Sequence, residues 1–342
     1  MKNFWIRLFL RFFSQKNRSG PPRRILVVAT TALGDTLWAT PALASLRQSF
    51  PEAYIAVVTS GVGMELLKHN PNVDRLYEWK NLWRLYKQWK GKAFDTALIF
   101  HASQRLPLPL CVAAGIGQIV GTAGLNKGLD DLLTLPLPNI RQHEIERRLA
   151  MVKAIGGKVH NHRLSLFLTK EEKRNVKPLY IADRWVAIHP GSKDVFKRWP
   201  LSSFAEVGNR LQKEYECQIL ITGTQEERDL MAQLAAKIPG SRILEQGLSL
   251  RQFAAVLEKM ALLISNDTGP VHVALALERP VIAIYASTDP ELCGPYQVQR
   301  AEVVARRATC MPCLKRKCQV PFCLMQIGPE EVIAKAAPYL VI

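Results

Sequence analysis

Short apolar runs alternate with amphipathic segments along the first half of the chain. Arg24–Ala29 is a β-branched run of the kind that forms a buried parallel strand. A helical pattern of apolar residues follows from Ala39 to Phe50 and stops near Pro51. Further strands are predicted at 54–59, 96–100 and 119–121. This alternation indicates a parallel sheet covered by helices.

The second half of the chain repeats the pattern. Strands are predicted at 185–189, 218–222, 262–265 and 281–285, and helices at 201–215, 226–238 and 250–259. The charged stretch from Thr169 to Asp183, which contains Pro178, separates the halves. With 342 residues, the chain exceeds the size at which one hydrophobic core stops growing. We therefore expect an α/β fold of two doubly wound, Rossmann-like domains, 24–178 and 179–342, facing each other across a cleft.

The charge of the chain adds a third segment at its start. A formal net charge of +17 indicates an anionic partner, and residues 1–23 contain basic but no acidic side chains. Trp5, Leu8, Phe9 and Phe12 follow the i, i+3, i+4, i+7 spacing of an apolar helical stripe. We expect Met1–Arg24 to lie on an anionic membrane surface, the alternative being a helix that docks on the protein's own body. No apolar run is long enough to span a bilayer.

A second segment with aromatic and basic residues, Glu78–Lys92, allows the same two interpretations. Trp79, Leu82, Trp83 and Tyr86 fall on one helical face, with basic side chains around it. This face could contact a membrane interface, or it could pack into the core beneath a solvated basic surface.

The seven cysteines include one local cluster. An odd number without an export signal indicates a reducing compartment. Cys310, Cys313, Cys318 and Cys323 have the spacing of a zinc knuckle with Cys in place of His, so four thiolates could hold a structural zinc ion. The alternatives are free thiols in a packed loop or a disulfide under oxidising conditions.

Candidate chemistry lies in loops that follow the predicted strands, where open α/β sheets bind their ligands. Asp35 follows the first strand and could remove a proton from a substrate hydroxyl or cap a helix. The loop His189-Pro190-Gly191-Ser192, followed by Lys197, could grip a diphosphate. Glu226 could accept hydrogen bonds from ribose hydroxyls or cap the next helix. The chain contains neither G-x-G-x-x-G nor a Walker A motif, which argues against a standard dehydrogenase or P-loop enzyme.

The loop Asn266–His272 (NDTGPVH) is the most distinctive of the four. Asp267 and Thr268 can cap the helix that starts there, and Pro270 suits a first helical position. The free backbone N–H groups of a helix start hold phosphate, and His272 lies one turn further in. The alternative is an ordinary capped helix with a buried histidine.

Together these motifs carry a family resemblance. In order, they are Gly34-Asp35 with Pro41-Ala42-Leu43, His189–Ser192 with Lys197-Arg198-Trp199-Pro200, Asn266–His272, Pro280-Val281 and Thr288-Asp289-Pro290. From about Arg24 to about Ala336 the chain resembles glycosyltransferase family 9, the ADP-heptose:lipopolysaccharide heptosyltransferases. The resemblance implies a GT-B fold, an inverting mechanism without a catalytic metal or other catalytic cofactor, and a nucleotide-sugar donor bound mainly by the second domain.

The resemblance also assigns roles by position. Asp35 matches the general base. The donor-binding residues that it implies are Ser192, Lys197, Glu226, Asp267, Thr268, Gly269 and His272. The stretch Leu106–Pro138, which should face the acceptor, matches nothing assignable.

The expected function is transfer of heptose or a related sugar, with ADP-heptose the implied donor. The expected acceptor is an anionic, lipid-linked glycan of the lipopolysaccharide type or another cell-envelope glycan. The expected location is cytoplasmic, on the inner face of the cytoplasmic membrane. The alternative is a basic nucleic-acid-binding protein that uses the cysteine knuckle, but this leaves the ordered loops unexplained.

Overall fold

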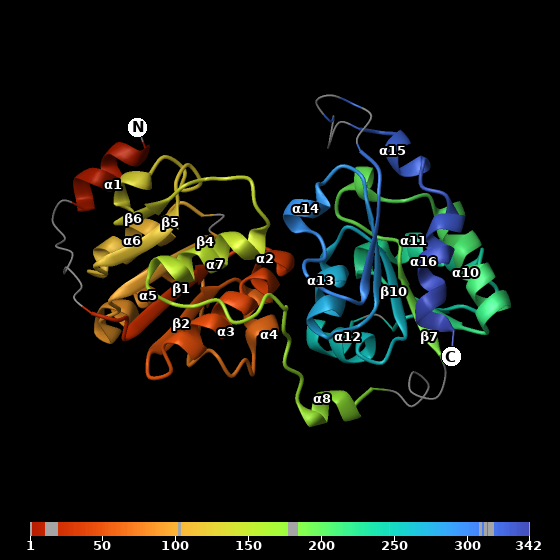
Figure 1. Ribbon diagram of the computed structural model, residues 1–342, viewed down its shortest axis with the longest axis horizontal. Helices are drawn as coiled ribbons and strands as arrows, with labels where there is room; N and C mark the ends of the chain where they lie inside the picture. Colours follow the sequence, from red (N-terminus) through yellow and green to blue (C-terminus); the bar gives the residue numbers. More distant parts are fainter. Residues whose placement is uncertain are drawn as a thin grey trace. The chain divides into compact units, whose positions relative to one another are not determined.

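The computed structural model describes residues 2–10, 20–101, 104–176, 184–245, 247–307, 310, 313 and 318–341. The chain forms two compact units, Met1–Phe167 and Leu168–Ile342, and each contains one parallel six-stranded sheet (Figure 1). Two doubly wound, Rossmann-like domains are therefore confirmed. The expected domain boundary at 178 falls within 177–183, outside the described residues.

Unit 1 has the strand order β3-β2-β1-β4-β5-β6. Its strands are β1 (Arg24–Ala29), β2 (Tyr54–Thr59), β3 (Arg75–Glu78), β4 (Thr96–His101), β5 (Gln118–Thr122) and β6 (Leu135–Leu137). Its helices are α1 (Lys2–Leu10), α2 (Leu33–Trp38), α3 (Thr40–Ser49), α4 (Gly61–Leu67), α5 (Leu82–Lys92), α6 (Pro107–Ala113), the 3₁₀ helix η1 (Asp130–Leu132) and α7 (Glu144–Ala154). The sheet winds outward from β1 in both directions, so the strand order reverses between β1 and β4.

Unit 2 repeats this plan with the order β12-β11-β10-β7-β8-β9. Its strands are β7 (Trp185–His189), β8 (Gln218–Ile221), β9 (Arg242–Ile243), β10 (Leu262–Asn266), β11 (Val281–Tyr285) and β12 (Ala301–Ala305). Its helices are α8 (Lys170–Arg174), η2 (Val195–Lys197), α10 (Leu201–Tyr215), η3 (Gln225–Glu227), α11 (Arg228–Ala235), α12 (Leu250–Leu257), α13 (Gly269–Ala276), α14 (Pro290–Cys293), α15 (Phe322–Met325) and α16 (Pro329–Leu340). The order reverses here between β7 and β10.

The predicted strands are the central ones, and the edge strands were missed. β7 and β10 are buried along their whole length because helices cover both faces of a parallel sheet, and such strands read as continuous apolar runs. The four missed strands, β3, β6, β9 and β12, are the outer strands of the two sheets. They are exposed or partly exposed, with charged residues or a proline among their apolar ones, so their sequences lack that signal.

The amino-terminal helix α1 docks on unit 1. Leu10 is buried in the same apolar cluster as residues of α5 and α6, and Ile6 packs against that cluster. The Asn3 amide donates to the carbonyl oxygens of Lys127 and Gly128 at 3.1 and 3.2 Å. The alternative of docking on the protein's own body therefore applies to residues 2–10, although Phe4 and Trp5 stay exposed. Phe12 and the rest of 11–19 lie outside the described residues.

The aromatic stripe expected in Glu78–Lys92 is partly buried, because Trp79 and Tyr86 pack against the apolar cluster of unit 1. α5 begins only at Leu82, and it buries Leu85 and Trp89, whereas Trp83 is 65% exposed. The core-packing interpretation of this stripe is therefore wrong for Trp83. Within the described ranges, no helix is both long and apolar enough to cross a membrane.

Candidate functional site

The candidate donor site of unit 2 is built where its strand order reverses. The loops that follow β7 and β10 leave neighbouring strands at their carboxyl ends, and their connections run to opposite sides of the sheet. This divergence opens a crevice in doubly wound sheets, which is where such sheets bind ligands. The two loops are His189–Ser192 and Asn266–Gly269, as the sequence predicted.

Asn266 links these two loops through one buried side chain. Its amide nitrogen donates to the carbonyl oxygens of Pro190 and Gly191 at 2.8 and 3.4 Å. Its side-chain oxygen accepts the backbone N–H of Trp199 at 3.0 Å. A fully buried amide with these bonds fixes the loop after β7 against the end of β10.

The Asp267 carboxylate contacts two polar side chains of the site, those of Lys197 and Thr288. The Lys197 ammonium lies 2.5 Å from its Oδ2, and the Thr288 hydroxyl donates to the same oxygen. Burial, together with the nearby charge of Asp267, raises the pKa of Tyr285 well above its ordinary value. The structure thus brings Lys197 and Asp267 together, and Thr288 joins them from the loop after β11.

The start of α13 differs in one respect from the expected cap. Thr268 occupies the N-cap position but its side chain makes no capping hydrogen bond. Its hydroxyl instead lies 3.3 Å from the carbonyl oxygen of Asn266, while the Asp267 carboxylate is engaged by Lys197 and Thr288. The prediction that these two side chains cap the helix is therefore wrong. The helix does begin at Gly269, so its first backbone N–H groups are not taken by the Thr268 side chain.

Two further predicted residues of this site, Ser192 and His272, are buried. Ser192 is 4% exposed, and its carbonyl oxygen accepts the Arg198 guanidinium at 2.9 Å. His272 is 5% exposed within α13, which matches the alternative of a buried histidine.

Of the two adjacent glutamates, Glu227 rather than Glu226 contacts the loop after β7. Its Oε2 accepts the backbone N–H of Thr224 at 2.9 Å, so it supplies the acidic cap of η3. A Cβ at Gly191 would lie 2.2 Å from the Glu227 carboxylate, so only glycine fits there. Glu226 is exposed, and hydrogen bonds from its own backbone and from Thr224 lower its pKa.

His189 lies between Glu227 and β8 and is neutral at physiological pH. Its Nδ1 is 3.0 Å from the Thr222 hydroxyl and its Nε2 is 3.9 Å from Glu227 Oε2. Burial lowers the pKa of His189 although the charge of Glu227 opposes this.

In unit 1, Asp35 follows β1 at the corresponding reversal of strand order. It lies in the first turn of α2, and Ala32 rather than Asp35 is the N-cap residue, so the capping interpretation of Asp35 is wrong. Its Oδ1 accepts a hydrogen bond from Arg148 Nη2 at 3.1 Å. The carboxylate is about one-fifth exposed, so it remains accessible to a ligand.

Arg148 of α7 contacts Asp35 and was not among the residues predicted from the sequence. Its side chain is fully buried, and its Nη1 donates to the carbonyl oxygen and to Oε2 of Glu144, each at 2.7 Å. Its Cζ lies 5.7 Å from the centre of the Trp38 ring. Burial alone would raise the pKa of Glu144, but Arg148, with Arg147 and His101, holds it below its ordinary value.

A signal for Arg148 does exist in the sequence. Ile145, Leu149 and Val152 form the buried face of α7, and position 148 falls on that face. A charged residue there requires a partner, because an unpaired buried charge is strongly unfavourable. Nothing local identifies Asp35 as that partner, since the two residues are far apart in the chain.

All four cysteines of the cluster, Cys310, Cys313, Cys318 and Cys323, lie among the described residues. Cys323 is buried in α15, and burial raises the pKa of its thiol, with Cys313 and Cys318 adding to the effect. Residues 311–312 and 314–317 lie outside the described part of the chain. Among the residues that are described, no group of three or more His, Cys, Asp or Glu is placed to hold a metal ion.

Solved structures of other proteins share this fold. A family 9 glycosyltransferase from Veillonella parvula DSM 2008 has a TM-score of 0.80 at 22% identity, covering 93% of this chain and 97% of that one. E. coli heptosyltransferase WaaC with ADP-2-deoxy-2-fluoro heptose has a TM-score of 0.70 at 19% identity, covering 92% and 99%. The fold is that of a GT-B glycosyltransferase.

The chain belongs to glycosyltransferase family 9 (heptosyltransferase), whose sequence profile matches residues 82–323. It is also similar to lipopolysaccharide heptosyltransferase 1 of Pseudomonas aeruginosa, with 26% identity over 353 residues, 90% of this chain and 96% of that protein. The family expected from the sequence is thereby confirmed, and the nucleic-acid-binding alternative has no support in these comparisons.

Proposed function

We propose that this protein transfers heptose from ADP-heptose to an anionic, lipid-linked acceptor of the lipopolysaccharide type. The observation that carries the proposal is the group of Lys197, Asp267 and Asn266 at the strand reversal of unit 2, in a chain of family 9. The names of its relatives supply the sugar and the acceptor class: one is a lipopolysaccharide heptosyltransferase and one solved structure contains an ADP-heptose analogue.

In the proposed reaction Asp35 is the general base. As the acceptor oxygen attacks the anomeric carbon, its proton passes to the Asp35 carboxylate. The bond between that carbon and the donor diphosphate breaks, and ADP leaves with the bonding electrons. Attack opposite the leaving group inverts the anomeric configuration. Arg148 keeps the Asp35 carboxylate turned toward one position during this step.

The leaving diphosphate gains negative charge, which unit 2 is suited to stabilise. Lys197 supplies an ammonium, and the start of α13 at Gly269 supplies backbone N–H groups and the positive end of a helix dipole. The loop that contains Ser192 is already fixed by Asn266, so little ordering is needed when the donor binds. The carboxylate of Glu226, which is exposed, accepts hydrogen bonds from the ribose hydroxyls in this proposal.

We further propose that unit 1 binds an anionic membrane surface on the cytoplasmic side through α1 and α5. Phe4 and Trp5 are 63% and 67% exposed, and α5 presents Trp83 with the Lys87 ammonium 5.0 Å from its ring centre. Exposed aromatic side chains beside lysines are typical of helices in the headgroup layer. Trp5→Ser with Trp83→Ser is expected to reduce sedimentation with anionic vesicles, and unchanged sedimentation would contradict this assignment.

The cysteine spacing supports a second addition to the proposal, a structural zinc ion held by Cys310, Cys313, Cys318 and Cys323. Elemental analysis of the purified protein tests it: we expect one zinc per chain in the natural protein and none after Cys313→Ser with Cys318→Ser. A protein free of metal when purified under reducing conditions would exclude the site.

The main proposal is tested by donor binding and transfer measured separately. Thermal-shift assays against ADP-, UDP-, GDP- and CMP-sugars should show stabilisation by ADP-heptose, because a ligand of the native state raises its melting temperature. Asp35→Asn should bind ADP-heptose as the natural protein does but transfer heptose at a greatly reduced rate. Lost donor affinity in Asp35→Asn would exclude the base assignment, and stabilisation by a different nucleotide sugar would exclude ADP-heptose.

A further inference from the structure

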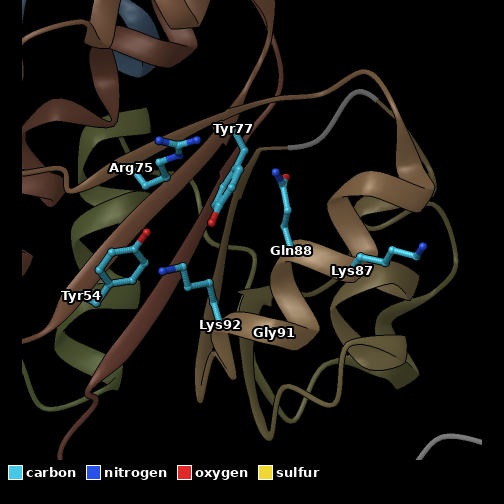
Figure 2. A pocket seen from close by; sticks show the side chains of 7 residues that line it. All are labelled: Tyr54, Arg75, Tyr77, Lys87, Gln88, Gly91 and Lys92. Carbon is cyan, nitrogen blue, oxygen red and sulfur yellow. The ribbon is translucent and has the colours of Figure 1, made fainter.

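Unit 1 contains a pocket of about 440 Å³ at the amino ends of its strands (Figure 2). Tyr54 and Arg75 stand at the starts of β2 and β3, and the carboxyl-terminal half of α5 closes the other side. Asp35, in contrast, follows the carboxyl end of β1. The pocket is therefore separate from the site proposed for transfer. Its lining residues are Tyr54, Arg75, Tyr77, Lys87, Gln88, Gly91 and Lys92.

The pocket is positively charged and has no acidic residue in its lining. In the described part of the chain, its three cations, Arg75, Lys87 and Lys92, form no ion pair. The acidic residue next to Arg75 is engaged elsewhere: Asp74 Oδ2 accepts Arg47 Nη2 at 2.6 Å and the backbone N–H of Ile55 at 2.7 Å. Among the residues that the structure describes, no carboxylate therefore pairs with the cations of this pocket.

Two tyrosine rings position the cations. Lys92 Nζ lies 5.2 Å from the centre of the Tyr54 ring, and Arg75 Cζ lies 5.9 Å from the centre of the Tyr77 ring. Figure 2 shows the Lys92 ammonium and the Tyr77 hydroxyl directed into the same space, with the Gln88 side chain beside them, whereas the Lys87 ammonium points away. Lys87 lies instead over the Trp83 ring. Arg75, beside the Tyr77 ring, and Lys92, beside the Tyr54 ring, are therefore the two cations that remain in the lining of the pocket.

The tyrosine hydroxyls can act as donors to an anion. Burial, followed by the charge interaction and the side-chain hydrogen bond with Tyr54, raises the pKa of Tyr77 to about 12, so its hydroxyl stays protonated at physiological pH. An ammonium, a guanidinium and phenol O–H groups around one space are donors that match the oxygens of a phosphate group. The volume leaves room for a small substituent such as glycerol or a sugar.

We propose that this pocket is a binding site for a phosphate group carried by a small polar substituent, with Arg75 and Lys92 as its principal ligands. It lies beside the exposed Trp83 of α5, so its ligand is either an anionic lipid headgroup or a soluble sugar or glycerol phosphate. The site is additional to the donor and acceptor sites and does not depend on the proposed transfer reaction.

Calorimetric titration with glycerol 3-phosphate tests the site in the full-length protein. We expect Arg75→Gln and Lys92→Gln each to weaken binding about five- to tenfold, and the double variant to abolish it, because each loses a charge-assisted hydrogen bond. Lys153→Gln, which removes one exposed charge from α7, is the matched control and should bind normally. These positions are exposed, so melting temperatures should agree.

Lys197→Ala separates this site from the donor site, which also binds phosphate in the proposed function. Glycerol 3-phosphate binding that persists in Lys197→Ala and disappears in the Arg75→Gln, Lys92→Gln double variant supports the pocket. Binding that disappears in Lys197→Ala and persists in the double variant overturns it, as does equal loss in Lys153→Gln. Failure of the natural protein to bind ADP-heptose, while it still binds glycerol 3-phosphate, would contradict only the proposed function.

Vesicles identify the source of the phosphate. Phosphatidylcholine vesicles containing phosphatidic acid should compete with glycerol 3-phosphate if a lipid headgroup is the ligand, and fail to compete if the ligand is soluble. Either outcome supports the pocket, provided that the Arg75→Gln, Lys92→Gln double variant no longer binds glycerol 3-phosphate. A protein that binds neither probe overturns the proposal.

Discussion

Replacing Arg148 by methionine should slow transfer by loosening the Asp35 carboxylate. Methionine fills similar apolar space but removes the 3.1 Å hydrogen bond to Asp35 and both 2.7 Å bonds to Glu144. A hydrogen bond to a charged group contributes about 1.5–3 kcal/mol. If that energy serves to orient the base, kcat falls about tenfold to a hundredfold, since about 1.4 kcal/mol corresponds to a factor of ten.

The same substitution should lower stability, which the assay has to separate from the effect on kcat. Removing one member of a buried ion pair costs about 3–5 kcal/mol, so urea unfolding accompanies the kinetics and rates are measured where every variant is folded. Arg147→Met is the matched control, because Arg147 also pairs with Glu144, at 3.3 Å, but does not contact Asp35. We expect Arg147→Met to leave kcat nearly unchanged, and donor affinity to be unchanged in both variants.

A double-mutant cycle decides whether Arg148 acts through Asp35. In an Asp35→Asn background, with its residual transfer rate, Arg148→Met should have little further effect on kcat, because the group that it positions is already lost. An equal loss in both backgrounds would refute the reasoning and assign to Arg148 a general structural role.

Three more predictions concern unit 2. Lys197→Ala should weaken ADP binding about tenfold by calorimetry, since it removes a charge-assisted contact; unchanged affinity would remove Lys197 from the diphosphate site. Glu226→Gln should lower donor affinity about fivefold, by loss of one hydrogen bond. Glu227→Gln should mainly lower the melting temperature, because Glu227 caps η3. The reverse result would assign the ribose contact to Glu227. Burial lowers the pKa of His189 below its ordinary 6.5. As the pH falls, His189 is therefore protonated in the unfolded state before it is protonated in the folded state. The free energy of unfolding should decrease as the pH drops below about 6.5. Urea unfolding at pH 7 and pH 5 should show a smaller decrease for His189→Gln, and an equal decrease would contradict the burial of a neutral imidazole.

The central strands and the loops after them could be predicted because they follow from local patterns. Continuous apolar runs identified β1, β7 and β10, and the rule that ligands bind beyond strand ends then selected Asp35 and the Asn266–His272 loop. Motif order gave the family. These inferences need no knowledge of which distant residues touch.

Partners of individual side chains could not be predicted, because they depend on three-dimensional contacts. Arg148 and Asp35 meet only when α7 packs beside α2, and no local signal links them. Asp267 was expected to cap α13, but its carboxylate instead contacts Lys197 and Thr288 from other loops. The motif alone does not distinguish Glu226 from Glu227 as the ribose ligand, because the two residues are adjacent and only the helical register decides which side chain faces the loop after β7.

The Lys197–Asp267 ion pair means that an incoming diphosphate does not meet a bare cation. In the proposed reaction the diphosphate and the Asp267 carboxylate share the three N–H donors of the Lys197 ammonium. Because Asp267 already compensates part of the charge of Lys197, ADP affinity should depend less on ionic strength than it would with an unpaired lysine. The same Asp267 oxygen accepts the Thr288 hydroxyl, so the carboxylate is held in place by two side chains before any donor binds.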